Sequence, residues 1–411
     1  MPTPTGTLAI DGGNPVHDRP WPVWPVHDET EAAALQDVLQ SGQWWSVGGR
    51  RVPEFEAAFA ASQDAAHATC VTNGTAAIEV ALRAMGVGCG DEVIVPPYTF
   101  VATATSVLAV SATPVFVDVE LDSFNMNPAA AAAAITDRTR AIIPVHIGGR
   151  PADMDGILTL ARARGLGVIE DAAQAHAAEW RGRKVGALGD CGTFSFQASK
   201  NLNCGEGGAV VSNDDALADS IWSIHNVGRA RAGRWYEHNV LGSNFRMTEW
   251  QAAILCAQLA RLPEQTARRT ANAAILTERL RQIEGITLLS ADERITTNAY
   301  HLFIFRYCEA EFGGHTRDEF VDALCAEGVP SAAGYVPLYR EAVFAERDAA
   351  GARCRAARTI DYANADCPAC EQVCADGVWL FQTQLLGSAE EMHEIAEAIL
   401  KIQRAWRESA R

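Results

Sequence analysis

Residues 192–208 read GTFSFQASKNLNCGEGG, and this stretch carries the strongest structural signal in the sequence. Its first part, Gly192–Phe196, is an apolar and aromatic run typical of a buried strand. A polar, glycine-rich turn follows and holds a single lysine, Lys200. Most lysines are solvated surface residues. A lysine held in a turn after a buried strand can instead serve as a Schiff-base amine, positioned where a carbonyl group can condense with it.

Similar short apolar runs precede this segment and alternate with helical patterns. The expected strands are residues 91–95, 113–118, 141–146 and 167–171. The expected helices are residues 75–84, 128–135 and 154–164. Apolar strands that alternate with helices predict a mostly parallel sheet that is covered by helices on both faces. The sequence therefore predicts an α/β fold.

Two changes of pattern divide the rest of the chain. The start is rich in Pro and Trp (RPWPVWPVHDET) and predicts an arm laid over the body, residues 1–40. From about Thr248 a long helical stretch leads through Pro263 into a smaller α+β region. We therefore expect a large domain over residues 41–262 and a small C-terminal domain over residues 263–411.

The composition excludes some classes of partner. The 411 residues include 34 Lys and Arg against 51 Asp and Glu, a formal net charge of −17. This balance argues against nucleic acid, whose phosphates need clustered basic residues, and against an anionic membrane surface. No stretch resembles a transmembrane helix, and the first residues lack a signal-peptide pattern. The 11 cysteines then favour reduced thiols and a cytoplasmic location.

A carboxylate, Asp171, is expected at the carboxyl end of the strand 167–171. That edge is where open α/β sheets bind ligands. A carboxylate there could pair with the pyridine nitrogen of a pyridoxal phosphate ring and keep it protonated. Asp171 could also cap a helix that begins at the following Ala-Ala-Gln, and the two roles are compatible.

A phosphate group needs a helix N-terminus with small residues, and the segment VTNGT provides one. Gly74 and Thr75 open the helix 75–84. The backbone amides and the Thr75 hydroxyl could donate to an anion that the helix dipole also favours. Ser195, near the end of its strand, could add another hydroxyl. Such strand-to-helix turns are common, so this feature alone is weak evidence.

Taken together, the motifs resemble those of the DegT/StrS-type sugar aminotransferases, a branch of the fold-type I pyridoxal-phosphate enzymes. The resemblance extends from about Pro22 to about Ala405. The sequence is similar in particular to keto-cyclitol aminotransferases and to 3-amino-5-hydroxybenzoate synthase. It shares the motif GQWW-x-x-GG with the latter. The motifs, in chain order, are TNGTAAIEVAL, GDEVIVPPYTFVATA, PVHIGGRPADMD, VIEDAAQAH, GTFSFQASKNLNCGEGGAVV and GSNFRMTEWQAA.

The resemblance implies a role for each matching residue in the catalytic centre. Lys200 would form the Schiff base with pyridoxal 5′-phosphate and move the proton between substrate and cofactor. Asp171 would pair with the pyridine nitrogen, and Gln174 would lie beside the cofactor near its phenolic oxygen. Phe100 would stack on the ring, although a core aromatic is the alternative for this residue.

The phosphate and the second subunit are also implied by the resemblance. Gly74, Thr75 and Ser195 would hold the phosphate. Asn244 would reach it from the neighbouring subunit, which implies a homodimer with shared active sites. Related dehydratases have histidine at the position of Lys200, so the lysine favours transamination.

These residues predict an aminotransferase that moves an amino group from glutamine or glutamate to a keto-cyclitol or keto-sugar in antibiotic or other secondary metabolism. Two alternatives remain open. One is an aromatising dehydratase that resembles 3-amino-5-hydroxybenzoate synthase. The other is a non-catalytic relative that binds the cofactor for regulation.

Several other residues are candidates for a site. Cys367, Cys370 and Cys374 resemble half a zinc site without a fourth ligand at the expected spacing, so we expect packing or surface cysteines and no metal. Trp44 and Trp45 could form a substrate wall or dock the arm. The last two candidates, for which a structural role is expected, are His301 and Tyr335.

Overall fold

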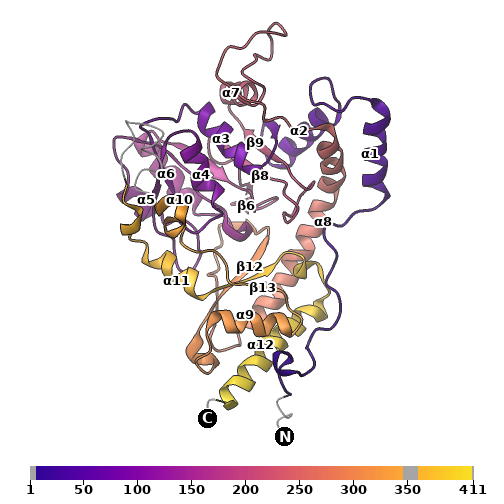
Figure 1. Ribbon diagram of the computed structural model, residues 1–411, viewed down its shortest axis with the longest axis vertical. Coiled ribbons are helices and arrows are strands. Elements are labelled where there is room, and N and C mark those ends of the chain that lie inside the picture. Colours follow the sequence, from indigo (N-terminus) through magenta and orange to yellow (C-terminus); the bar gives the residue numbers. More distant parts are fainter. Residues whose placement is uncertain (1–5, 346–359, 410–411) are drawn as a thin grey trace.

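A computed structural model of the protein describes residues 6–345 and 360–409 (Figure 1). The central sheet has seven strands in the order β1-β9-β8-β5-β4-β2-β3. β9 is antiparallel to both β1 and β8, and every other pairing is parallel, so the predicted mostly parallel sheet is confirmed. The strands are β1 His67–Val71, β2 Glu92–Val95, β3 Thr113–Phe116, β4 Thr139–Ile142, β5 Gly167–Asp171, β8 Cys191–Ser195 and β9 Gly208–Ser212.

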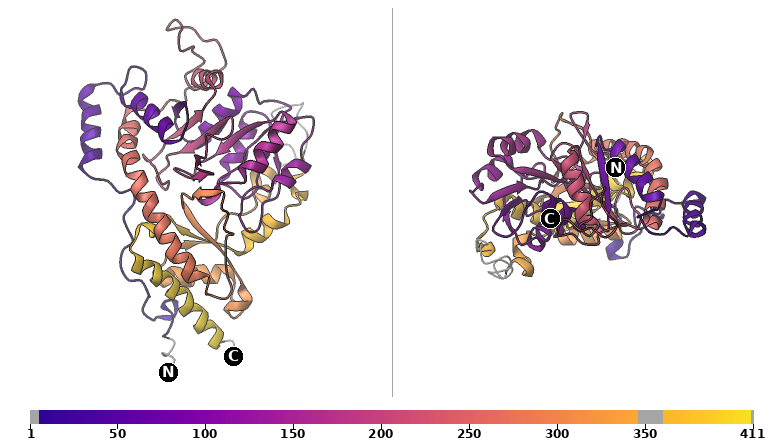
Figure 2. Two further views of the ribbon diagram at one scale, coloured as in Figure 1. Left: turned by 180° about the vertical axis from the view of Figure 1, so that it is seen from behind. Right: turned by 90° about the horizontal axis from the view of Figure 1, so that it is seen from above.

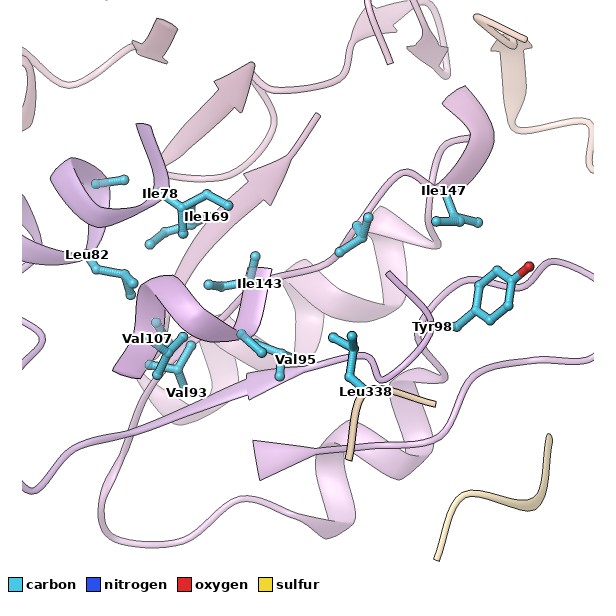
Figure 3. Packing of buried hydrophobic residues seen from close by; sticks show 14 of the residues in the cluster. Ile78, Leu82, Val93, Val95, Tyr98, Val107, Ile143, Ile147, Ile169 and Leu338 are labelled. Atoms are coloured by element: carbon cyan, nitrogen blue, oxygen red, sulfur yellow. The ribbon is translucent and has the colours of Figure 1, made fainter. Parts of the chain in front are cut away.

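Helices cover both faces of this sheet, because its strands are apolar on both sides. Val93 and Val95 pack toward α3, α4 and α7, and Figure 3 shows part of this cluster. Ile94 points the other way and packs with α2, α5 and α6. The helices are α2 Arg51–Ser62, α3 Gly74–Ala84, α4 Ala102–Ala109, α5 Pro128–Ala133, α6 Met154–Arg164 and α7 Asp215–His225.

The strand expected at residues 141–146 is wrong in its bounds, since β4 ends at Ile142. The nitrogen of Ile143 still donates to the carbonyl of Ile94, but Pro144 has no N–H to continue the ladder. A short 3-10 turn, Ile147–Gly149, follows. The regular strand therefore ends early. Pairing with β5 continues only as an isolated bridge between Val145 and Asp171, where the nitrogen of Asp171 donates to the carbonyl of Pro144 over 2.9 Å and the nitrogen of His146 donates to the carbonyl of Asp171 over 3.1 Å.

A second, antiparallel sheet lies below the first in Figure 1 and has the order β10-β12-β14-β13. Its core is shared with α9, α12 and the C-terminal part of α8. A third, small sheet joins β11 Ile295–Thr297 to β6 Glu179–Trp180 and β7 Arg183–Lys184. The strands of the second sheet are β10 Ile286–Leu288, β12 Leu302–Tyr307, β13 Ser331–Ala332 and β14 Gly377–Phe381. The helices in the same part of the chain are α9 Arg317–Ala326, α11 Pro368–Asp376 and α12 Ala389–Ser409.

One long helix, α8 (Glu249–Leu280), connects the regions of the two sheets (Figure 2). It continues through Pro263, and thus across the domain boundary expected near residue 262, which stays a prediction. The helix packs on α1 (Glu29–Ser41) and α2 and also on α12. Glu31 of α1 accepts a hydrogen bond from Gln258 of α8, 2.8 Å away, and pairs with Arg261 at 3.1 Å. These contacts attach the N-terminal segment to the body.

No helix within residues 6–345 and 360–409 is both long and apolar enough to cross a bilayer. Among the described cysteines, nine are free thiols. Cys89 is disulfide-bonded, so the expectation of reduced thiols is wrong at that residue.

Candidate active site

A cavity of about 1130 Å³ opens where the carboxyl ends of β1, β5 and β8 meet. β1 runs in the same direction as β8 because β9 is antiparallel to both, so the three strands end at one edge. Seven of the eight residues expected at the site line this cavity: Gly74, Thr75, Phe100, Asp171, Gln174, Ser195 and Lys200.

Lys200 lies in the turn after β8, where its backbone nitrogen donates to the carbonyl of Gln197, 2.8 Å away. Burial lowers the pKa of Lys200 to about 8, and the negative charge of Asp171 opposes this shift. A larger share of the amine is therefore neutral, and nucleophilic, near neutral pH than for an ordinary lysine.

Asp171 ends β5 and is almost completely buried. The hydroxyl of Thr103, on α4, donates to its Oδ2 over 2.7 Å, and Thr99 contacts the same hydroxyl at 2.9 Å. Burial raises the pKa of Asp171, while the hydrogen bond from Thr103 opposes the shift. The carboxylate thus faces the cavity with neutral hydrogen-bond donors and Lys200 as the nearby cation.

The helix that Asp171 could have capped, beginning at Ala172, does not form. Residues 172–178 are turns that lead into β6, and the nitrogen of Ala173 donates to Asp171 Oδ1 at 3.2 Å. The alternative role of Asp171 as a helix cap is therefore wrong. The physical reason is that the small residues of this segment pack as a buried connection between two sheets.

Gln174 is held from both ends of its amide. Its Oε1 accepts a hydrogen bond from the nitrogen of Gly148, 2.7 Å away, and its Nε2 donates to the hydroxyl of Tyr335 over 3.0 Å. Burial raises the pKa of Tyr335 to about 12, so the phenol stays protonated. Tyr335 also lines the cavity and stacks edge-on against Tyr98 and Trp379.

Gly74 begins α3 and lies directly against Ser195 of β8. A Cβ at this position would lie 2.8 Å from the Cβ of Ser195, closer than two carbons can approach, so only glycine fits. The side chain of Asn73 caps the helix by accepting from the nitrogen of Ala76 at 2.9 Å. The first turn of α3 and the Ser195 hydroxyl are therefore held together at one end of the cavity.

Phe100 is 58% exposed and lines the cavity, so the core alternative for this residue is wrong. His301 and Tyr335, for which the sequence predicts structural roles, also line the cavity. The Nδ1 of His301 lies 3.2 Å from Oδ1 of Asn201. Two further lining residues were not predicted from the sequence. Trp24 comes from the N-terminal segment, and Thr103 lies one turn after Thr99 in the motif PPYTFVATA.

Asn244 does not line the cavity. It is exposed and forms a backbone bridge with Asn226 at the end of α7. The segment between these two residues projects from the body beyond α7 (Figure 1). Its exposed apolar side chains, all more than 45% accessible, are Trp235, Tyr236, Val240 and Leu241.

Trp44 and Trp45 are also outside the cavity lining. Trp44 packs against Trp250, and Trp45 packs edge-on against Trp235. The cysteines at 367, 370 and 374 are buried in an apolar core cluster, as expected for packing residues. Within the described part of the chain, no group of three or more His, Cys, Asp or Glu could hold a metal ion.

The profile of the DegT/DnrJ/EryC1/StrS aminotransferase family matches residues 25–399. The chain belongs to this family. It is therefore an aminotransferase, as the sequence predicted.

Related proteins and the solved structures of related proteins match this aminotransferase over nearly the whole chain. It is 40% identical to a 3-amino-5-hydroxybenzoate synthase from Amycolatopsis mediterranei, over 92% of this chain and 96% of the relative. It is 39% identical to a putative L-glutamine:3-amino-2,3-dideoxy-scyllo-inosose aminotransferase from Streptoalloteichus tenebrarius, over 97% and 98%. A crystal structure of 3-amino-5-hydroxybenzoic acid synthase matches with a TM-score of 0.86 at 39% identity, over 95% and 99%.

Proposed function

We propose that this aminotransferase uses pyridoxal 5′-phosphate to move an amino group from L-glutamine or L-glutamate to a keto-cyclitol or keto-sugar. The pathway would be antibiotic or other secondary metabolism. One observation carries the proposal. The amine of Lys200, the buried carboxylate of Asp171 and the helix N-terminus at Gly74 line the same cavity. The named scyllo-inosose aminotransferases among the relatives support a cyclitol as the acceptor.

The residues present fit this cofactor. Members of the family are generally dependent on it. The first turn of α3 and the Ser195 hydroxyl suit a phosphate, because a Cβ at Gly74 would fill the space between them. Asp171 is a buried carboxylate that suits a protonated ring nitrogen. Phe100 and Gln174 line the walls between these two ends.

When bound, the cofactor would supply an electron sink for the carbanion that forms at the substrate carbon. Asp171 would keep a proton on the ring nitrogen, and Thr103 would hold this carboxylate in place. Gln174 and Tyr335 would orient the ring from its side. Lys200, as a neutral amine, would remove the proton from the donor carbon and return a proton to the acceptor carbon.

A half-reaction screen tests the proposed function. The visible absorbance of the purified protein would be recorded first with amino-acid donors and then with ketones. We expect L-glutamine or L-glutamate to change it and 2-deoxy-scyllo-inosose to restore it. A second candidate, an aromatising dehydratase, is favoured by the relative that is 40% identical. Release of an aromatic product from an aminoshikimate-type ring would select that candidate instead.

The lowered pKa of Lys200 makes a pH-dependent prediction. Only the neutral amine captures an aldehyde, so the rate at which cofactor-free protein captures pyridoxal 5′-phosphate should rise with pH. The midpoint is expected near the Lys200 pKa of about 8. Because the Asp171 charge raises this pKa, Asp171→Asn should move the midpoint to lower pH. Stopped-flow absorbance measures both, and a midpoint at the ordinary lysine value would contradict the prediction.

We also propose a homodimer with shared active sites in the cytoplasm. Asn244 lies outside the cavity of its own chain, and the exposed apolar side chains next to it suit a subunit contact. Asn244 could donate to the phosphate of the partner's cofactor. Such a bond to a charged group contributes about 1.5–3 kcal/mol.

Subunit mixing tests the shared site. Asn244→Ala should loosen the cofactor, and Lys200→Ala should be inactive. In a mixed dimer one site carries both defects and the other neither. Random pairing makes about half of the dimers mixed, so activity at limiting cofactor should return to about a quarter of the wild-type value. Demonstrated subunit exchange without returning activity would contradict the shared site.

A further inference from the structure

A buried arginine lies beside the proposed substrate cavity without a carboxylate partner. Arg269, on α8, is completely buried. Its Nε donates to Oε1 of Gln382 over 3.0 Å, and its Nη2 donates to the same oxygen. The indole of Trp24 lies against the guanidinium, 5.3 Å away. Within the described residues no acidic side chain pairs with Arg269, and its Nη1 has no hydrogen-bond partner.

This contact determines which way the amide of Gln382 faces. A guanidinium has only donors, so the amide oxygen must point at Arg269 and the amide nitrogen must point away from it. That nitrogen, Nε2, is buried and has no acceptor among residues 6–345 and 360–409. Gln382 itself lines the cavity with Lys200. The chain therefore holds an oriented and unused N–H donor on a residue that lines the cavity.

Trp24 and Gln382, which both contact Arg269, are also bonded to residues around Lys200. The indole nitrogen of Trp24 donates to the carbonyl of Ala198, two residues before Lys200, over 3.0 Å. The backbone nitrogen of Gln382 donates to the carbonyl of His301, another cavity residue, over 3.2 Å. The donor is thus fixed relative to Lys200 by contacts from the N-terminal segment and from the second sheet.

A negatively charged ligand would stabilise both the unpaired guanidinium of Arg269 and the unpaired amide nitrogen of Gln382. A buried donor without an acceptor is unfavourable, and a buried charge without a counter-ion is more so. Burial alone lowers the pKa of Arg269 to about 9, which still leaves it charged at pH 7. An amide whose oxygen is bound to a cation is a stronger donor, and an anion beside it also interacts with the charge behind.

We propose that Gln382 binds the carboxylate of the amino-acid donor through Nε2, and that Arg269 is a positioning residue that orients the amide and supplies the positive charge. The identity of the ligand as an amino-acid donor rests on the proposed function. A carboxylate is the negatively charged group that every amino-acid donor carries. Hydroxyl groups of a cyclitol are neutral and would gain less from the charge of Arg269.

Gln382→Glu is the sharpest test. The new carboxylate would pair with Arg269, so the fold is expected to survive, but the N–H donor is lost and the incoming carboxylate meets a negative charge. We expect a roughly 10- to 100-fold higher Kd or KM for L-glutamate, the scale expected for losing a hydrogen bond to a charged group. Binding of glutarate, an unreactive dicarboxylate, should weaken by a similar factor in calorimetry.

The half-reaction with an aminocyclitol, which carries no carboxylate, is the internal control. We expect it to change less than about threefold in Gln382→Glu. Arg269→Gln should raise the KM for L-glutamate and leave kcat nearly unchanged, and Arg269→Lys should recover part of the loss because it restores the charge. Arg268→Gln is the matched control, since Arg268 contacts the carbonyl of Gly387 and does not contact Gln382.

Equal losses in the glutamate and aminocyclitol half-reactions, or unchanged glutarate binding in Gln382→Glu, would overturn the inference. A loss confined to the aminocyclitol would overturn it too and would assign Gln382 to the acceptor. If the wild-type protein reacts with glutamate and with no cyclitol, the proposed acceptor fails instead. In that case glutarate binding and the KM for glutamate still decide the role of Gln382.

Discussion

Lys200→Ala is expected to abolish transamination and covalent attachment of the cofactor. The rate should fall by at least roughly a thousandfold, because the same amine anchors the cofactor and moves the proton in both half-reactions. Lys200 is the lysine that lines the cavity among the described residues. Borohydride reduction followed by denaturation measures the attachment, and turnover is measured with saturating cofactor.

Lys184→Ala is the matched control for this variant. Lys184 pairs with Glu179 at 2.7 Å in the small third sheet, away from the cavity lining. This control should retain the cofactor and most of its activity. If Lys200→Ala still carried a borohydride-stable adduct at a single site, another amine would be the anchor and the proposed assignment of Lys200 would fail.

Asp171→Asn is expected to lower turnover by roughly two or more orders of magnitude. Asparagine keeps the shape of the side chain and its contact with Thr103, but it removes the charge that would hold a proton on the ring nitrogen. Turnover is measured at saturating donor and acceptor, and the absorption spectrum of the bound cofactor reports its protonation state.

The cofactor-free protein provides an independent control for Asp171→Asn. Burial raises the pKa of Asp171 in the folded protein. At pH values above the ordinary aspartate pKa, the charge on Asp171 therefore lowers the stability of the folded state relative to the unfolded chain. Removing the charge should leave the melting temperature at pH 7 unchanged or higher. Near-normal turnover in this variant would contradict a catalytic role for the carboxylate. A lower melting temperature would contradict the expected effect of removing the buried charge.

Local sequence patterns predicted the α/β class and the approximate bounds of several elements around the central sheet, but gave no bounds for β1, β9, α2, α4 or α7. Helix α6 and strand β5 have the predicted bounds, because their apolar spacing and end residues suffice to define them. The pattern was misleading where tertiary contacts compete. β4 stops at Ile142 before Pro144, and the segment after Asp171 packs as turns although Ala-Ala-Gln favours a helix.

The sequence motifs identify the family and contain Lys200, Asp171 and Gly74, because the chemistry of these motifs follows from residue type and local backbone. The contacts of these residues, in contrast, depend on tertiary packing. Thr103 reaches Asp171 across 68 residues and Tyr335 reaches Gln174 across 161. Arg269 and Gln382 are 113 residues apart. Such pairs leave no periodic or motif signal, because their meeting depends on how the two sheets and α8 pack and not on any local preference of the chain.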